Sequence, residues 1–188
     1  MRFCAIAALV LAAAAGGGSA TVDELRTATG KIDAIKSDRL HAGARVDLSV
    51  GELNAWVQGQ VPTGVRNARL HIDSPGVATG TALVDIAKVS RSQGFEPGWL
   101  LSRLLEGERP VKVTAHIQSA DGSAKVDVQR VEISGLEIDG KTLEMLIQYI
   151  LLPVYPNATV GRPFELGHNI ERFEVQPAVV RVVIAPKR

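Results

Sequence analysis

The spacing of the apolar residues switches repeatedly between the helical and the strand period along this chain. From Val22 to Ile35 apolar residues recur every three or four positions, which predicts an amphipathic helix over residues 22 to 37. Ala44, Val46 and Leu48 then alternate with polar residues, which predicts a short strand. A chain that changes period in this way folds by packing helices against a sheet.

The next helix has the clearest boundaries in the sequence. Ser49 and Glu52 stand at the spacing of a capping box, in which each residue satisfies the other's free main-chain amide. Leu48 before the cap and Leu53 after it fit the hydrophobic staple that accompanies such a box. We therefore predict a helix from about residue 50 to residue 58.

Three pairs of alternating segments indicate antiparallel hairpins. The first joins residues 68–73 to 77–86, and the second joins residues 111–118 to 124–133 through Asp121-Gly122. In the second hairpin the apolar positions change from even to odd near Arg130, so we expect a β-bulge there. Residues 173–175 and 180–184 form the closing pair.

Two further segments have helical spacing and very little polar surface. One follows Pro97 and runs to Leu105, and the other runs from about Asp139, a plausible N-cap, to Leu152. Helices this apolar must be covered on most sides. We therefore expect an α+β fold in which a long curved antiparallel β-sheet wraps a few short apolar helices, with residues 21–188 as a single domain.

The N-terminus has the pattern of a secretory signal peptide over residues 1–20. Arg2 precedes an apolar run from Phe3 to Ala15, and small residues follow up to Ala20. A retained membrane anchor is the alternative, although thirteen apolar residues fall short of the roughly 20 needed to cross a bilayer. We expect a cleaved signal and a periplasmic or secreted protein. Since Cys4 is the only cysteine, the mature domain would have no disulfide and no thiol.

Charge and motifs exclude several classes of function. Without residues 1–20 the chain has 20 basic and 20 acidic residues, scattered along its length, so we expect no nucleic-acid partner. The four histidines stand far apart and lack ligand spacing, so we expect no metal and no cofactor. No nucleophile elbow or phosphate-binding loop is found, and we expect a protein that is not an enzyme, with an unrecognised hydrolase as the third possibility.

Several stretches together resemble bacterial envelope proteins of the tubular lipid-binding superfamily. They are Leu48–Trp56 after a short strand, the Ile150-Leu151-Leu152-Pro153 end of an apolar helix, and Gly167–Val175 before a valine-rich strand. The resemblance implies a strongly curved sheet around a long helix, with an apolar tunnel for acyl chains. It covers most of the mature chain in the order of its elements.

The chain has more large apolar side chains beside its helices than a core of this size requires. We expect part of this set to line an interior cavity or groove for a lipid or another apolar ligand, with Trp99 at its mouth, and the rest to be ordinary core. The partners would then be a lipid or a membrane surface. The alternative is a ligand-free interaction or scaffold protein of the cell envelope, with an envelope protein as partner. The candidate lining residues are Trp56, Trp99, Leu100, Leu104, Met145, Leu146, Ile147, Tyr149 and Ile150.

Overall fold

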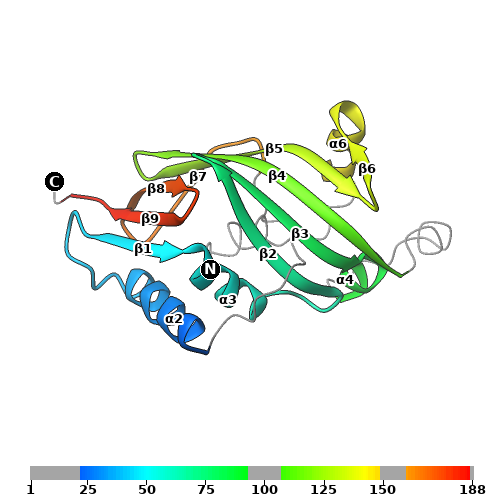
Figure 1. Ribbon diagram of the computed structural model, residues 1–188. Helices are drawn as coiled ribbons and strands as arrows, with labels where there is room; N and C mark the ends of the chain where they lie inside the picture. The colour runs from blue at the N-terminus through cyan, green and yellow to red at the C-terminus, as the bar shows by residue number, and fades with distance from the viewer. Residues whose placement is uncertain (1–21, 93–106, 149–159, 187–188) are drawn as a thin grey trace.

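The computed structural model of this protein describes residues 22–92, 107–148 and 160–186. It has an α+β fold with a large antiparallel sheet and a small one (Figure 1). In chain order the elements are α2 (Val22–Lys36), β1 (Arg45–Ser49), α3 (Val50–Gln58), β2 (Val65–Ser74), β3 (Val77–Asp85), α4 (Ile86–Ser92), β4 (Glu108–Ala120), β5 (Ser123–Ile133), β6 (Leu136–Ile138), α6 (Gly140–Leu146), β7 (Phe164–Glu165), β8 (Ile170–Gln176) and β9 (Val179–Ile184).

The large sheet is built from the two predicted long hairpins. Its strands follow one another in the order β2-β3-β4-β5-β6, and β7 pairs with β5 beyond this path. Asp121 and Gly122 both have the left-handed backbone that a two-residue hairpin turn requires. The predicted bulge is confirmed, because Thr114 pairs with Arg130 whereas Ala115 pairs with Val128, which leaves one extra residue in β5.

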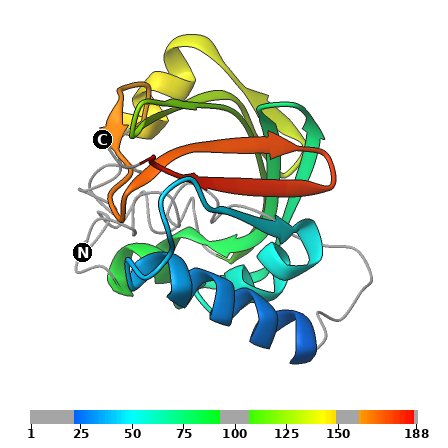
Figure 2. The same ribbon diagram turned by 90° about the vertical axis from the view of Figure 1, so that its left-hand side faces the viewer.

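The small sheet closes the chain on itself. Its strands lie in the order β1-β9-β8, so the predicted closing hairpin of β8 and β9 pairs with the strand that follows the first helix. Figure 2 shows this sheet across one end of the large sheet, with α2 and α3 beside it. Residues from opposite ends of the chain therefore share one core.

Helix α3 has the predicted boundaries and the predicted cap. The Glu52 amide donates to Ser49 Oγ at 3.1 Å, and the Ser49 amide donates to the Glu52 carboxylate at 2.8 Å. Leu48 lies in the buried core cluster, and Leu53 packs against the same cluster. The capping box and the staple pattern are both present.

Two side chains tie the small sheet and α3 to the large sheet. On β4, Ser119 Oγ accepts from the Phe173 amide at 2.7 Å and donates to the Phe173 carbonyl at 2.9 Å. On α3, the Asn54 side chain bonds both the amide and the carbonyl of Leu70 on the edge strand β2. Each of these contacts provides hydrogen-bond partners for main-chain groups that are not bonded to a neighbouring strand of their own sheet.

The structure departs from the sequence prediction in three places. Ile86, placed at the end of the second strand, begins α4 instead, because the Asp85 carboxylate caps the turn by accepting from the Lys88 amide at 2.9 Å. The short strands β6 and β7 were not predicted, since two or three residues carry no measurable periodicity. Asp139 precedes α6 as predicted, but its side chain makes no capping hydrogen bond.

Other predictions fall partly or wholly outside the described residues. The predicted signal peptide and the apolar segment 97–105 lie outside them, and α6 is described as far as a final turn at Ile147 and Gln148. In the part of the chain that the structure describes, no helix is both long enough and apolar enough to cross a bilayer.

Candidate apolar binding cavity

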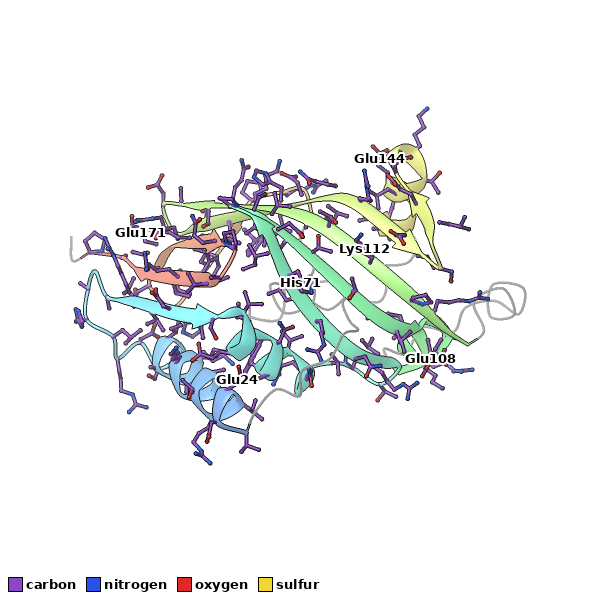
Figure 3. All side chains as sticks on the ribbon, viewed as in Figure 1. Glu24, His71, Glu108, Lys112, Glu144 and Glu171 are labelled. Carbon is purple, nitrogen blue, oxygen red and sulfur yellow. The ribbon has the colours of Figure 1, made fainter. Side chains whose placement is uncertain are left out.

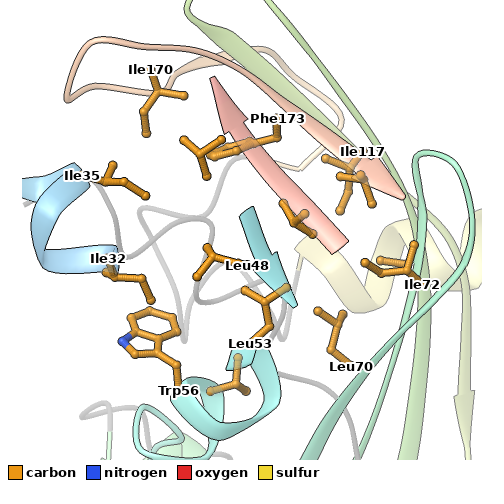
Figure 4. A pocket seen from close by; sticks show the side chains of 15 residues that line it. Ile32, Ile35, Leu48, Leu53, Trp56, Leu70, Ile72, Ile117, Ile170 and Phe173 are labelled. Carbon is orange, nitrogen blue, oxygen red and sulfur yellow. The ribbon is translucent and has the colours of Figure 1, made fainter. Parts of the chain in front are cut away.

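An apolar cavity of about 140 Å³ lies where α2, α3 and the small sheet meet the end of the large sheet (Figure 4). All of its described lining residues are aliphatic or aromatic. They are Ile32, Ile35, Leu48, Leu53, Trp56, Val57, Leu70, Ile72, Ala78, Ile117, Ile170, Phe173, Val175, Val180 and Val182. No charged group and no hydrogen-bonding side chain, apart from the Trp56 indole, belongs to this set.

Each element contributes to the lining through its apolar face. In β2, Leu70 and Ile72 are buried while the alternate residues His71 and Asp73 are exposed, as the strand period requires. In α2, Ala28, Ile32 and Ile35 are buried at helical spacing, and the two isoleucines line the cavity. The cavity therefore lies where the apolar faces of these elements meet, and the spacing of apolar residues in the sequence already predicts those faces.

Small residues on one strand leave the space open. Ala78, Gly80 and Ala82 occupy successive inward positions of β3, and Ala115 on β4 pairs with Ala78. Positions with side chains this short cannot fill the depth between the two sheets. The large side chains opposite them, such as Phe173 and Val175 on β8, fill only part of that depth.

Trp56 forms the border of the cavity on the helical side. Its indole is half-buried and lies next to Ile32 in Figure 4. On α2, the ammonium of the exposed Lys36 lies 5.8 Å from the centroid of the indole ring, within the range of a cation–π contact. An aromatic ring between an apolar interior and a cation at the surface suits the boundary of a binding site.

A second apolar cavity, of about 40 Å³, adjoins the first along the inner face of the large sheet. Its described lining consists of Leu70, Ala78, Gly80, Val113, Ala115, Ile117, Ala124, Val126, Phe164 and Phe173. Four of these residues also line the first cavity: Leu70, Ala78, Ile117 and Phe173. The two spaces are thus neighbours, and they share a wall.

Lys31 and Glu52, the sequence neighbours of the lining residues Ile32 and Leu53, form an ion pair with each other. Lys31 on α2 donates to both oxygens of the buried Glu52 carboxylate, at 2.7 and 2.8 Å, and so joins α2 to α3. Burial opposes ionisation of Glu52, but the hydrogen bonds from Lys31 and from the Ser49 amide outweigh it and hold the pKa of Glu52 below its ordinary value.

The outer face of the small sheet carries a ladder of ion pairs. Arg181 on β9 pairs in register with Asp47 on one side and Glu174 on the other, and it contacts both carboxylates. The side-chain hydrogen bond from Arg181 holds the pKa of Asp47 below its ordinary value. In Figure 3, labelled charged side chains such as Glu144 and Glu108 likewise lie at the periphery of the fold.

The predicted lining residues differ in where the structure places them. Trp56 lines the first cavity. Ile147 is half-buried after the end of α6 and lines neither of the two cavities, and Met145 and Leu146 belong to α6 itself. Trp99, Leu100, Leu104, Tyr149 and Ile150 lie outside the described residues.

Most of the lining of the first cavity was not predicted as a site. Leu48, Leu70, Phe173 and Val182, for example, occupy apolar positions in alternating strands, which is equally the pattern of ordinary core. The run of short side chains on β3 was the available signal, because an inward face of alanine and glycine leaves room that neighbouring elements must fill.

The titratable residues form no candidate metal site within the described ranges. Among residues 22–92, 107–148 and 160–186, no three His, Cys, Asp or Glu side chains are close enough together to hold a metal ion. His71 is exposed on the outer face of β2, and His116 is half-buried on β4. Comparison of the chain with protein-family models, with curated proteins and with solved structures finds no match.

Proposed function

We propose that this protein is an exported, non-enzymatic domain that binds a lipid or another apolar ligand inside its fold. The observation that carries the proposal is the cavity of about 140 Å³ lined by fifteen apolar residues from two helices and both sheets. An engineered apolar cavity of roughly 150 Å³ stays dry and takes up benzene or xenon. The space in this protein therefore fits a ring or a short stretch of hydrocarbon chain.

The cost of leaving such a space empty supports a ligand. At roughly 24 cal/mol per Å³, an unfilled cavity of about 140 Å³ lowers the free energy of unfolding by on the order of 3 kcal/mol. That is a large fraction of the 5–15 kcal/mol by which typical domains are stable. An apolar ligand that fills the space recovers part of this loss.

The proposal extends to the rest of the large sheet, which we suggest wraps the apolar segments 97–105 and 143–152. Beyond the two cavities its inner face continues with Ala82, Val111 and Ile133, which lie in register across β3, β4 and β5, and with Val84 on β3. An apolar sheet face requires an apolar cover. Trp99, Leu100, Leu104, Met145, Leu146, Ile147, Tyr149 and Ile150 would supply that cover and extend the ligand site.

The proposal that the protein is exported rests on its N-terminal sequence. Arg2, the apolar run and the small residues up to Ala20 have the order of a cleaved signal. Periplasmic or secreted protein beginning near Thr21 is the expected product, and N-terminal sequencing of protein from the producing cell checks it. Membrane-bound protein that retains Phe3 would contradict this part of the proposal.

Organic extraction and native mass spectrometry of the purified mature protein test the binding function. We expect a co-purifying apolar molecule, or stoichiometric uptake of added benzene by the emptied protein. Ala78→Leu fills the shared wall of the cavities and should abolish uptake, whereas Thr81→Leu places the same side chain on the outer face of β3 and should leave it unchanged. A protein that takes up neither lipid nor benzene would leave the envelope scaffold as the better hypothesis.

A further inference from the structure

We propose that Phe173 determines how long a hydrocarbon chain the interior accepts, by closing the passage between the two cavities. This inference rests on the proposed function, because it names the ligand as a linear hydrocarbon chain and the residue that limits its length.

The position of Phe173 in both linings is the first observation. Three of the four shared residues, Leu70, Ala78 and Ile117, come from strands of the large sheet and form one side of the boundary. Phe173 is the shared residue that comes from the small sheet, and Figure 4 shows it with Leu70 and Ile117 around the cavity. A side chain in that place divides the space or opens it according to its size.

The main chain of Phe173 is fixed, which leaves the ring as the part that can move. Ser119 Oγ bonds both its amide and its carbonyl, at 2.7 and 2.9 Å. The residues on either side point the other way, since Arg172 and Glu174 pair with each other at 2.8 Å on the outer face of β8. Opening the passage therefore requires a change of side-chain torsion and no change in the sheet.

The floor of the passage has room for a chain once the ring turns. Ala78 and Gly80 on β3 and Ala115 on β4 form its inner surface, and all three are too short to refill the space. Among the described residues, both linings contain only apolar side chains and glycine, with the Trp56 indole nitrogen as the one polar side-chain atom. The part of the ligand that lies there is therefore plain hydrocarbon, since an unpaired polar group would lose its hydration without compensation.

Phe173→Ala should join the two cavities permanently and lengthen the preferred ligand. The probes are benzene, butylbenzene and hexylbenzene, with dissociation constants measured by titration calorimetry on delipidated mature protein. Each additional buried methylene strengthens binding roughly fourfold. In the wild type this gain should stop at a shorter chain than in the variant. The ratio of the benzene dissociation constant to the hexylbenzene dissociation constant should therefore be at least about tenfold larger for Phe173→Ala than for the wild type.

Val175→Ala is the matched control. Val175 lies two residues away on the same face of β8 and lines the first cavity without lining the second, so its truncation enlarges the space without opening the passage. We expect stronger binding of benzene-sized probes and an unchanged preference for chain length. If Phe173→Ala does not fold, Phe173→Leu tests the same idea with a smaller opening and should shift the preference in the same direction.

The outcomes separate this inference from the function on which it rests. Binding of benzene by the wild type with the same length preference in all variants would overturn the role of Phe173 and leave the apolar-ligand function standing. Failure of the wild type and of every variant to bind any of the three probes would overturn both. A longer preferred chain in Phe173→Ala or Phe173→Leu, and not in Val175→Ala, supports the proposal.

Discussion

The side chain of Asn54 on α3 takes the place of a neighbouring strand for Leu70 on β2. Its Oδ1 accepts from the Leu70 amide at 2.6 Å, and its Nδ2 donates to the Leu70 carbonyl at 3.0 Å and to the Val50 carbonyl at 2.8 Å. β2 is the edge of the large sheet, so these main-chain groups have no strand beside them. One amide thus fixes the helix that carries Trp56 against the sheet that carries the cavity floor.

Asn54→Ala should lower the free energy of unfolding by roughly 1–3 kcal/mol, because the partly buried Leu70 amide and carbonyl lose their partner. Asn54→Asp is the informative companion. It keeps an acceptor for the Leu70 amide but places a carboxylate against the Leu70 carbonyl, so it should also destabilise. Chemical denaturation measures both, and a rescue by Asp would mean that the donor side of the amide contributes nothing.

Ser49→Ala should cost about 1 kcal/mol, the usual effect of removing an N-cap oxygen. The lost bond is the one from the Glu52 amide to Ser49 Oγ. Ser37→Ala serves as the control. The Ser37 hydroxyl donates to the Ala34 carbonyl at the C-terminal end of α2, so it caps no free amide. Equal denaturation midpoints for the wild type and Ser49→Ala would show that the cap contributes nothing to stability.

The ion pair of Lys31 and Glu52 should make stability depend on pH in the acid range. The pKa of Glu52 is lower in the folded protein than its ordinary value of 4.5, so the unfolded chain takes up a proton first as the pH falls. The stabilisation is complete above about pH 4.5 and disappears as the pH drops through the lowered pKa of the folded state.

Glu52→Gln isolates this contribution. Glutamine can complete a capping box but cannot be ionised, so the variant should be less stable than the wild type at neutral pH. Its free energy of unfolding should fall less between pH 4.5 and lower pH than that of the wild type. Parallel pH profiles for the two proteins would show that Glu52 does not titrate differently in the folded and unfolded states.

Gly64→Ala should destabilise the protein more than Gly43→Ala, although both glycines have a left-handed backbone. At Gly64 (φ +96°) a Cβ would lie 2.9 Å from the Val89 amide nitrogen and from Lys88 Cβ. At Gly43 (φ +76°) a Cβ would meet no atom within 4 Å. The Gly43 variant therefore measures the backbone penalty alone, about 1–2 kcal/mol, and thermal denaturation of the pair gives the contribution of the contact with α4.

Trp56 should report directly on the occupancy of the cavity. The chain has two tryptophans, so Trp99→Phe leaves Trp56 as the only one. Bromobenzene is a heavy-atom quencher that acts on contact, and its binding should reduce the fluorescence of this variant in a saturable way. Ala78→Leu, which fills the cavity, should remove the saturable component and leave ordinary collisional quenching. Saturable quenching that persists in Ala78→Leu would place the probe elsewhere.

The sequence alone determined the elements that are stabilised by neighbours along the chain. The boundaries and the cap of α3 follow from Ser49 and Glu52, which are three residues apart, and the Asp121-Gly122 turn with the bulge before Arg130 follows from the phase of one hairpin. Such features depend on hydrogen bonds and side-chain periods within a few residues, and both can be read from the order of the letters.

Only the tertiary structure decided which apolar faces enclose a space. Leu48 and Phe173 have the same pattern as core residues, and they line a cavity because the short side chains of Ala78 and Gly80 come to them from another part of the chain. The joints made by Asn54 and Ser119 likewise connect residues 16 and 54 positions apart. Periodicity specifies which face of an element is buried. The depth between two buried faces depends instead on packing between distant segments, and this depth decides whether the space is a filled core or a binding cavity.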